Sequence, residues 1–166
     1  MLKLSLADYT TLRAHGEETY PHECCGVLLG KSEADGNRVQ TTVRAGNTRT
    51  DSAHNRYNIA PEELVKIQRQ GRKLGLDIVG FYHSHPDHPA MWSATDFAEA
   101  HWMGCSYVIT AIAGGKATVT NSFLLTGTGE DDKQFIDEPV EIGMNAMQER
   151  KVDASKFPFP HLLDLQ

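Results

Sequence analysis

The run DIVGFY at residues 77–82 continues without a break into HSHP at residues 83–86. A short apolar run that is rich in β-branched and aromatic residues and bounded by polar segments is typical of a buried strand. We therefore expect the central strand of the fold at 77–82, followed by a polar loop over 83–92. The pattern after this loop predicts a helix that begins at Ser93 and ends at about Met103.

The segments on either side of this strand predict further helices and strands. Before it, we expect a helix over 6–20, strands over 25–30 and 39–43, a short strand over 57–59 and a helix over 61–74. After it, we expect strands over 107–113 and 117–125 and a strand or helix around 140–149. Gly114 and Gly115 join the first two of these, which favours a tight hairpin.

The composition indicates one globular domain with a substantial core. The chain has 166 residues, of which 40% are hydrophobic and 23% are charged. Its net charge is −6 and it has no Lys/Arg-rich block, which argues against nucleic acid or an anionic membrane as the main partner. We find no apolar run of signal-peptide or membrane-helix length, and the three cysteines are an odd number. These features predict a soluble, cytoplasmic protein.

His83 and His85 are the best candidates for metal ligands. Two histidines two positions apart at the end of an extended segment project to the same side, so both imidazoles can face one ion. Asp96, at the start of the expected helix, can complete a set of three ligands. Three protein ligands leave the fourth position of a tetrahedral zinc ion open for water, as in catalytic zinc sites. The sequence therefore predicts one catalytic Zn²⁺ per chain.

Glu23 and Ser93 are the candidates for catalytic roles beside this metal. Zinc-activated water needs a base that is not itself a ligand, and a carboxylate suits that role. Glu23 comes just before the strand expected at 25–30, and it would reach the metal if that strand lies beside 77–82. The Ser93 hydroxyl could donate a hydrogen bond to a developing oxyanion.

Each of these residues also has an ordinary structural interpretation. His83 and His85 could be polar residues at a strand end, and Glu23 could be a solvated charge. Ser93 and Asp96 fit a helix capping box, Ser-x-x-Asp, which needs no catalysis. Their combined spacing favours the metal site.

The remaining reactive side chains have less specific patterns. Cys24 and Cys25 could supply a thiol nucleophile, although small buried cysteines at a strand start are commoner, and Cys105 is expected in the core. The histidines His22, His54 and His88 are expected at the surface. Met91 and Trp92 could form an apolar lip for a substrate backbone or cover the core.

At these positions the sequence resembles the JAMM, or MPN-plus, metallopeptidase family. Ten residues separate His85 from Asp96, Ser93 stands three before Asp96, and PHECCG at 21–26 is similar to the family's Glu-x-Cys-Gly strand start. The resemblance covers about residues 1–125. Trp92 departs from it, because the family often has proline there.

The resemblance implies a fold, an activity and a partner. The fold would be a single mixed β-sheet flanked by helices, an α/β (α+β) arrangement of the JAMM/MPN, cytidine-deaminase-like type. It would occupy residues 1–138, with 139–166 as a C-terminal extension that could pack on it. Short bacterial members are zinc metallopeptidases associated with ubiquitin-like sulfur-carrier proteins, and they cleave an amide or isopeptide-like bond after the carrier's C-terminal Gly-Gly. A homodimer is left open.

Two other functions are compatible with parts of this pattern. A non-catalytic MPN-type scaffold would bind a protein partner, but such scaffolds usually lack some of the ligands. A zinc deaminase would need a Pro-Cys-x-x-Cys pair and a glutamate inside the histidine motif. The sequence contains neither.

Overall fold

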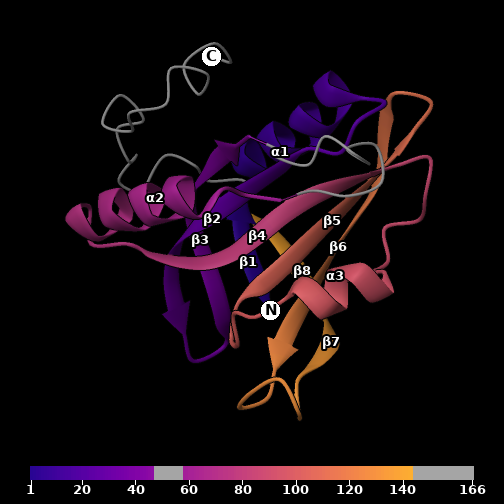
Figure 1. Cartoon of the computed structure of the whole chain (residues 1–166). Helices are drawn as coiled ribbons and strands as arrows, with labels where there is room; N and C mark the ends of the chain where they lie inside the picture. The colour runs from indigo at the N-terminus through magenta and orange to yellow at the C-terminus, as the bar shows by residue number, and fades with distance from the viewer. Residues whose placement is uncertain (47–57, 144–166) are drawn as a thin grey trace.

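The computed structural model describes residues 1–46 and 58–143. The elements are β1 (Leu2–Ser5), α1 (Leu6–Thr19), β2 (Cys25–Glu33), β3 (Gly36–Ala45), α2 (Pro61–Lys73), β4 (Asp77–Pro86), α3 (Ala94–Glu99), β5 (Ser106–Ala113), β6 (Lys116–Thr126), β7 (Gln134–Glu138) and β8 (Val140–Gly143). Within these residues the strands form one sheet in the order β7-β6-β5-β4-β2-β3-β1-β8 (Figure 1).

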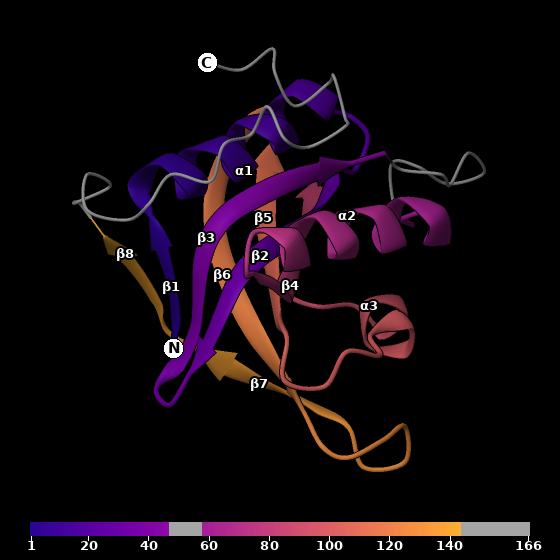
Figure 2. The same cartoon turned by 90° about the vertical axis from the view of Figure 1, so that its left-hand side faces the viewer.

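The sheet is mixed, as expected. β1 runs parallel to β3 and β8, and β4 runs parallel to β5, whereas the other neighbouring pairs are antiparallel. Helix α1 covers one face, and α2 and α3 lie on the other (Figure 2). The predicted fold class, a mixed sheet flanked by helices, is confirmed.

β4 is the central strand because both of its faces are buried. Every residue from Ile78 to Pro86 is buried. Phe81 packs in the cluster under α2 with Ile67, whereas Tyr82 packs under α1 with Leu12. A strand covered on both faces reads as a continuous apolar run rather than as an alternating one.

Two of the predicted boundaries near the histidines were wrong. β4 continues through Pro86, so His83 and His85 lie in a strand and not in the loop predicted over 83–92. The strand extends because β5 supplies parallel partners for it, from His83 opposite Ile109 to Pro86 opposite Ile112. The helix predicted to reach Met103 ends at Glu99.

The sheet also contains short strands that the sequence pattern did not predict. β1 and β7 have four and five residues, which is too short for a clear period. Residues 58–59 form no strand, and Tyr57, the first residue of that prediction, lies outside the described residues. β8 pairs with β1 and extends the sheet past position 138. The division of the chain at 138/139 stays a prediction, because 144–166 lie outside the described residues.

No helix among residues 1–46 and 58–143 is long and apolar enough to cross a membrane.

Gly80 allows β4 and β5 to approach closely. A Cβ at this position would lie 2.2 Å from the carbonyl oxygen of Ser106, which is backbone and cannot swing away. We expect Gly80→Ala to lower the free energy of unfolding by about 3 kcal/mol. Urea denaturation measures the change, with Gly129→Ala as control, since a Cβ there meets nothing within 4 Å. An unchanged midpoint for Gly80→Ala would contradict this packing.

Candidate metal centre

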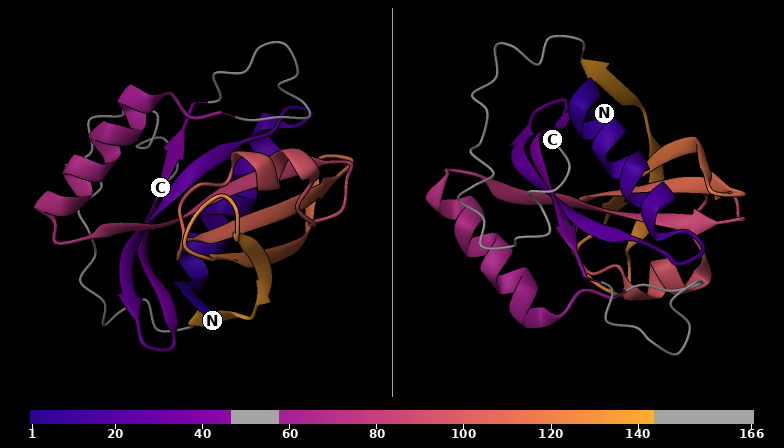
Figure 3. Two further views of the ribbon diagram at one scale, coloured as in Figure 1. Left: turned by 60° about the horizontal axis from the view of Figure 1, so that its bottom comes forward. Right: turned by 90° about the horizontal axis from the view of Figure 1, so that it is seen from above.

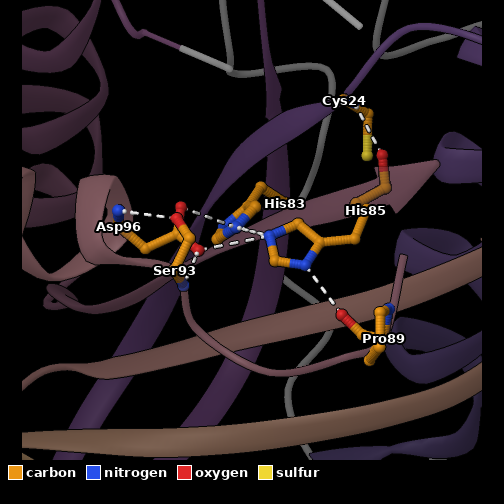
Figure 4. A network of polar contacts seen from close by, with 7 residues as sticks. Cys24, His83, His85, Pro89, Ser93 and Asp96 are labelled. Atoms are coloured by element: carbon orange, nitrogen blue, oxygen red, sulfur yellow. Dashed lines mark hydrogen bonds and ion pairs between the residues drawn. The ribbon is translucent and has the colours of Figure 1, made fainter. Parts of the chain in front are cut away.

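The two histidines of β4 point to the same side of the strand and face each other (Figure 4). Their Nε2 atoms are 3.1 Å apart and their ring centroids are 4.9 Å apart. Both side chains are buried, with 2% of His83 and 7% of His85 exposed. Strand geometry therefore produces the convergence that the His-x-His spacing predicts.

The carboxylate of Asp96 lies close to both imidazoles, and we call the side chains of His83, His85 and Asp96 the donor triangle. Its Oδ1 lies 3.3 Å from Nε2 of His83, and its Oδ2 lies 3.2 Å from Nε2 of His85. Two nitrogen or oxygen ligands bound to tetrahedral zinc at roughly 2.0–2.1 Å lie roughly 3.3 Å apart. The three contacts, at 3.1–3.3 Å, are close to this spacing and use both oxygens of Asp96, so the side chains of His83, His85 and Asp96 converge where one zinc ion could bind.

The imidazole of His85 is held in the orientation that a metal ligand needs. Its Nδ1 lies 2.8 Å from the carbonyl oxygen of Pro89. Because a carbonyl oxygen only accepts hydrogen bonds, Nδ1 carries the proton. In the neutral ring Nε2 then presents its lone pair to the centre of the triangle.

Burial and charge set the ionisation of the three groups. Burial lowers the pKa of His83 below its ordinary value, which favours the neutral form. Burial alone would also lower the pKa of His85, but Asp96 and the Pro89 carbonyl raise it above its ordinary value. Burial would raise the pKa of Asp96, yet hydrogen bonds with the two histidines hold it well below its usual range. The pair of imidazoles thus faces an ionised carboxylate.

Glu23 reaches the same site from the neighbouring strand. β2 lies antiparallel to β4 with Cys25 opposite His83, and Cys24 exchanges hydrogen bonds with Ser84. Continuing this register places Glu23 beside His85. One ligand atom from each of Glu23, His83 and His85 lies within 4.8 Å of the others. Glu23 was expected to reach the metal only if its strand lies beside the strand of the histidines. β2 does lie beside β4.

The environment of Glu23 suits proton transfer. Only 5% of the residue is exposed. Burial raises the pKa of its carboxyl group to about 8, against a smaller lowering by His85. A carboxyl group whose pKa is shifted toward neutrality can both take up and return a proton near physiological pH.

The capping box weighed as an alternative for Ser93 and Asp96 is present in the structure. The Ser93 hydroxyl oxygen accepts from the Asp96 backbone N–H at 3.0 Å, and the Ser93 N–H donates to Asp96 Oδ2 at 2.8 Å. The same carboxylate also faces both histidines. Capping and proximity to the histidines therefore occur together: Oδ2 accepts from the Ser93 N–H and also faces His85, whereas Oδ1 takes no part in the cap and faces His83.

A pocket of about 430 Å³ opens directly onto these side chains. Its lining consists of Glu23, His85, His88, Pro89, Met91, Trp92 and Ser93. Met91 is 54% exposed and Trp92 is 39% exposed. The Trp92 ring also stacks on Phe97 at 5.6 Å between centroids. Trp92 thus combines both roles considered for it, since it forms a wall of the pocket and covers part of the core.

Apart from His88, which lines the pocket, the other reactive residues in the described part of the chain do not join the site. Cys24, Cys25 and Cys105 are buried, free thiols, and burial raises the pKa of Cys24 to about 12. A thiol in that environment is not ionised at neutral pH and is a poor nucleophile. His22 and His88 are exposed, and His54 lies outside the described residues.

The sequence pattern did not indicate two groups that support the site. Ser84 lies between the histidines but points to the opposite face, where its hydroxyl oxygen accepts from the Cys24 N–H at 2.8 Å. The alternation of HSHP could have indicated this. The Pro89 carbonyl that orients His85 is a backbone group, so no side-chain pattern could have indicated it.

The curated proteins that match this chain include a desampylase and a probable conjugate cleaving protease. The chain is 39% identical over 94 residues to the desampylase of Haloferax volcanii, covering 57% of this chain and 66% of that protein. It is 32% identical over 105 residues to a probable TtuB-protein conjugate cleaving protease of Thermus thermophilus, covering 63% of this chain and 66% of that protein. Both matches span just under two thirds of the relative's length.

Comparison with solved structures and with families of domains supports the same relationship. A solution structure of a protein from Desulfitobacterium hafniense superposes with a TM-score of 0.73 at 28% identity, over 87% of this chain and 94% of that chain. The family described as prokaryotic homologs of the JAB domain matches residues 6–126, which is more than half of the chain. The resemblance to the short bacterial JAMM type is thereby confirmed. The chain belongs to the family of prokaryotic homologs of the JAB domain.

Proposed function

We propose that this protein is a zinc-dependent metallopeptidase that hydrolyses an amide or isopeptide-like bond after the C-terminal Gly-Gly of a ubiquitin-like, sulfur-carrier protein. The observation that carries the proposal is the triangle of His83, His85 and Asp96 with the buried carboxyl group of Glu23 beside it. Two relatives support the type of reaction by their names, one a desampylase and the other a conjugate cleaving protease.

In this proposal His83, His85 and Asp96 hold one zinc ion per chain. When bound, zinc supplies a Lewis acid that polarises the scissile carbonyl and lowers the pKa of water at the site. His85 keeps its orientation through Nδ1 and the Pro89 carbonyl. Asp96 keeps its orientation through the Ser93 N–H. The ligand set therefore does not have to reorganise during the reaction.

Glu23 moves the proton. Its carboxylate accepts a proton from the attacking water and donates it to the nitrogen of the leaving amine. The raised pKa of Glu23, caused mainly by burial, makes both transfers accessible near neutral pH. Glu23 lines the pocket with His85, so a bound substrate carbonyl and its nitrogen lie within its reach.

Ser93 supports the developing oxyanion. Its oxygen accepts the Asp96 N–H as a helix cap, which leaves the hydroxyl proton able to donate into the pocket that Ser93 lines. A donor aimed at the negative charge of a tetrahedral intermediate is commonly worth about 3 kcal/mol.

The pocket favours an extended tail with little side-chain bulk next to the metal. His85 and Glu23 contribute to the lining, and the exposed side chains of Met91 and Trp92 supply its apolar part. Glycine residues have no side chain to keep the scissile carbonyl away from buried histidines. This constraint supports the Gly-Gly end that we propose for the substrate.

A small ubiquitin-like carrier extended past Gly-Gly tests the proposal. We expect the zinc-loaded protein to release a carrier that ends in Gly-Gly with a free carboxylate, and mass spectrometry of both products locates the cut. A carrier with valine in place of the final glycine is the matched control and should be cleaved at least about tenfold more slowly. Stoichiometric zinc without cleavage of any such tail would refute the Gly-Gly specificity and favour another amide substrate, whereas a protein that binds no zinc would favour the MPN-type scaffold.

A further inference from the structure

Helix α3 carries the ligand candidate Asp96 but has little to stabilise it by itself. It has only six residues, and none of them is buried. Isolated helices of this length are unstable in water, so packing and capping from other elements must hold α3 in place. Ser93 caps its N-terminus, as described above.

Lys133, at the end of the β6–β7 loop, caps the other end of α3. Its Nζ lies 2.9 Å from the carbonyl oxygen of Phe97, 3.4 Å from that of Ala98 and 3.0 Å from that of Ala100. The last carbonyl groups of a helix have no partners within the helix, and a cation there also complements the helix dipole. The Lys133 ammonium group therefore donates hydrogen bonds to carbonyl groups at the C-terminal end of the helix that bears Asp96.

The Lys133 side chain is fixed rather than solvated. It is only 5% exposed, and Nζ lies 4.9 Å from the centroid of the Phe97 ring. Glu130 contacts Nζ at 2.8 Å and also contacts Nδ1 of His101 at 2.6 Å. His101 lies two residues beyond the end of α3, so Glu130 links Lys133 to the chain that follows this helix.

The β6–β7 loop is itself organised to present Lys133. The Asp132 carboxylate accepts hydrogen bonds from the backbone of Thr128 and Gly129 and from the Thr128 hydroxyl. Gly127 has φ 117°, and a Cβ there would lie 2.8 Å from Cα of Lys133. In the left view of Figure 3 this loop lies beside α3.

We infer that Lys133 is a positioning residue that holds α3, and through it the Asp96 carboxylate, against His83 and His85. The inference rests on the proposed function in one respect, because it gives Asp96 the role of a zinc ligand. Lys133 touches neither the ligands nor the pocket lining, so it acts through the backbone of residues 97–100. Loss of a group that hydrogen-bonds directly to a ligand commonly weakens metal binding about 10- to 100-fold, so for Lys133, which acts through the backbone, we expect an effect near the lower end of that range.

Lys133→Met tests the inference, because methionine keeps the apolar stem and removes the three carbonyl contacts. Arg13→Met is the matched control. Arg13 likewise donates to several acceptors, the Ala117 and Thr118 carbonyls and the Thr120 hydroxyl, but it joins α1 to β6. The measurements are zinc affinity by competition with a fluorescent chelator, the melting temperature, and hydrogen exchange of the α3 peptide in metal-free protein.

We expect Lys133→Met to weaken zinc binding about tenfold or more and to speed exchange in α3. Lys133→Arg, which keeps a cationic donor, should restore most of the affinity. Arg13→Met should lower the melting temperature and leave zinc affinity within about twofold of the wild-type value. Wild-type zinc affinity in Lys133→Met, or an equal loss in Arg13→Met, would overturn the positioning role.

If the wild-type protein takes up no zinc, the proposed function is refuted. The role of Lys133 is then tested by hydrogen exchange of the α3 peptide alone. Faster exchange in Lys133→Met, confined to α3, would then uphold the positioning of Asp96. Unchanged exchange would overturn it.

Discussion

Glu23→Gln is expected to reduce cleavage of a Gly-Gly-linked substrate by at least about 10³-fold while the protein keeps its zinc. Glutamine has nearly the shape of glutamate, so the packing around this buried position is preserved. The amide, however, can neither accept the proton of the attacking water nor deliver one to the leaving amine. The single substitution therefore removes proton transfer without removing a member of the donor triangle.

The measurement for Glu23→Gln combines the cleavage rate with the zinc content per chain. Glu62→Gln is a suitable control, because Glu62 is exposed in the first turn of α2 and should lose no activity. Loss of zinc from Glu23→Gln would show that Glu23 acts as a ligand, as its distance to the histidines permits. An active variant would remove Glu23 from the mechanism altogether.

His83→Ala is expected to weaken zinc binding by at least about a hundredfold and to abolish cleavage. Structural zinc sites with four ligands bind with about 10–16 kcal/mol, so one ligand is worth on the order of 3 kcal/mol. The His83 side chain is almost completely buried, and alanine supplies no donor atom in its place, so only His85 and Asp96 of the triangle remain. Asp96 would then face only one imidazole.

Elemental analysis of the purified variant and chelator competition measure the loss in His83→Ala. His22→Ala is the control: this exposed histidine lies next to Glu23 in the sequence but outside the triangle, and its replacement should leave zinc at about one per chain. Full zinc occupancy in His83→Ala would contradict the ligand assignment.

Much of the site could be predicted from the sequence because short-range geometry determines it. Alternation along β4 puts His83 and His85 on one face whatever the rest of the fold does. Asp96 follows from its place in the first turn of a helix that returns over the end of that strand. The prediction for Glu23 required one long-range assumption, that β2 lies beside β4. The antiparallel pairing of these strands, with Cys25 opposite His83, agrees with it.

Other features depend on tertiary contacts that a sequence pattern does not contain. The extension of β4 through Pro86 depends on pairing with β5, and the four-residue β1 exists because β3 and β8 flank it. In the sequence, nothing distinguishes Lys133 from an ordinary charged loop residue. Its role appears only when the β6–β7 loop folds against the end of α3.

Titration of metal-free protein with zinc, with the cleavage rate followed at each addition, tests whether the reaction depends on one zinc ion per chain. We expect no cleavage without metal, a linear rise in the rate up to one zinc per chain and a plateau beyond it. Cleavage that persists in the metal-free protein, or a rate that does not respond to zinc, would contradict it.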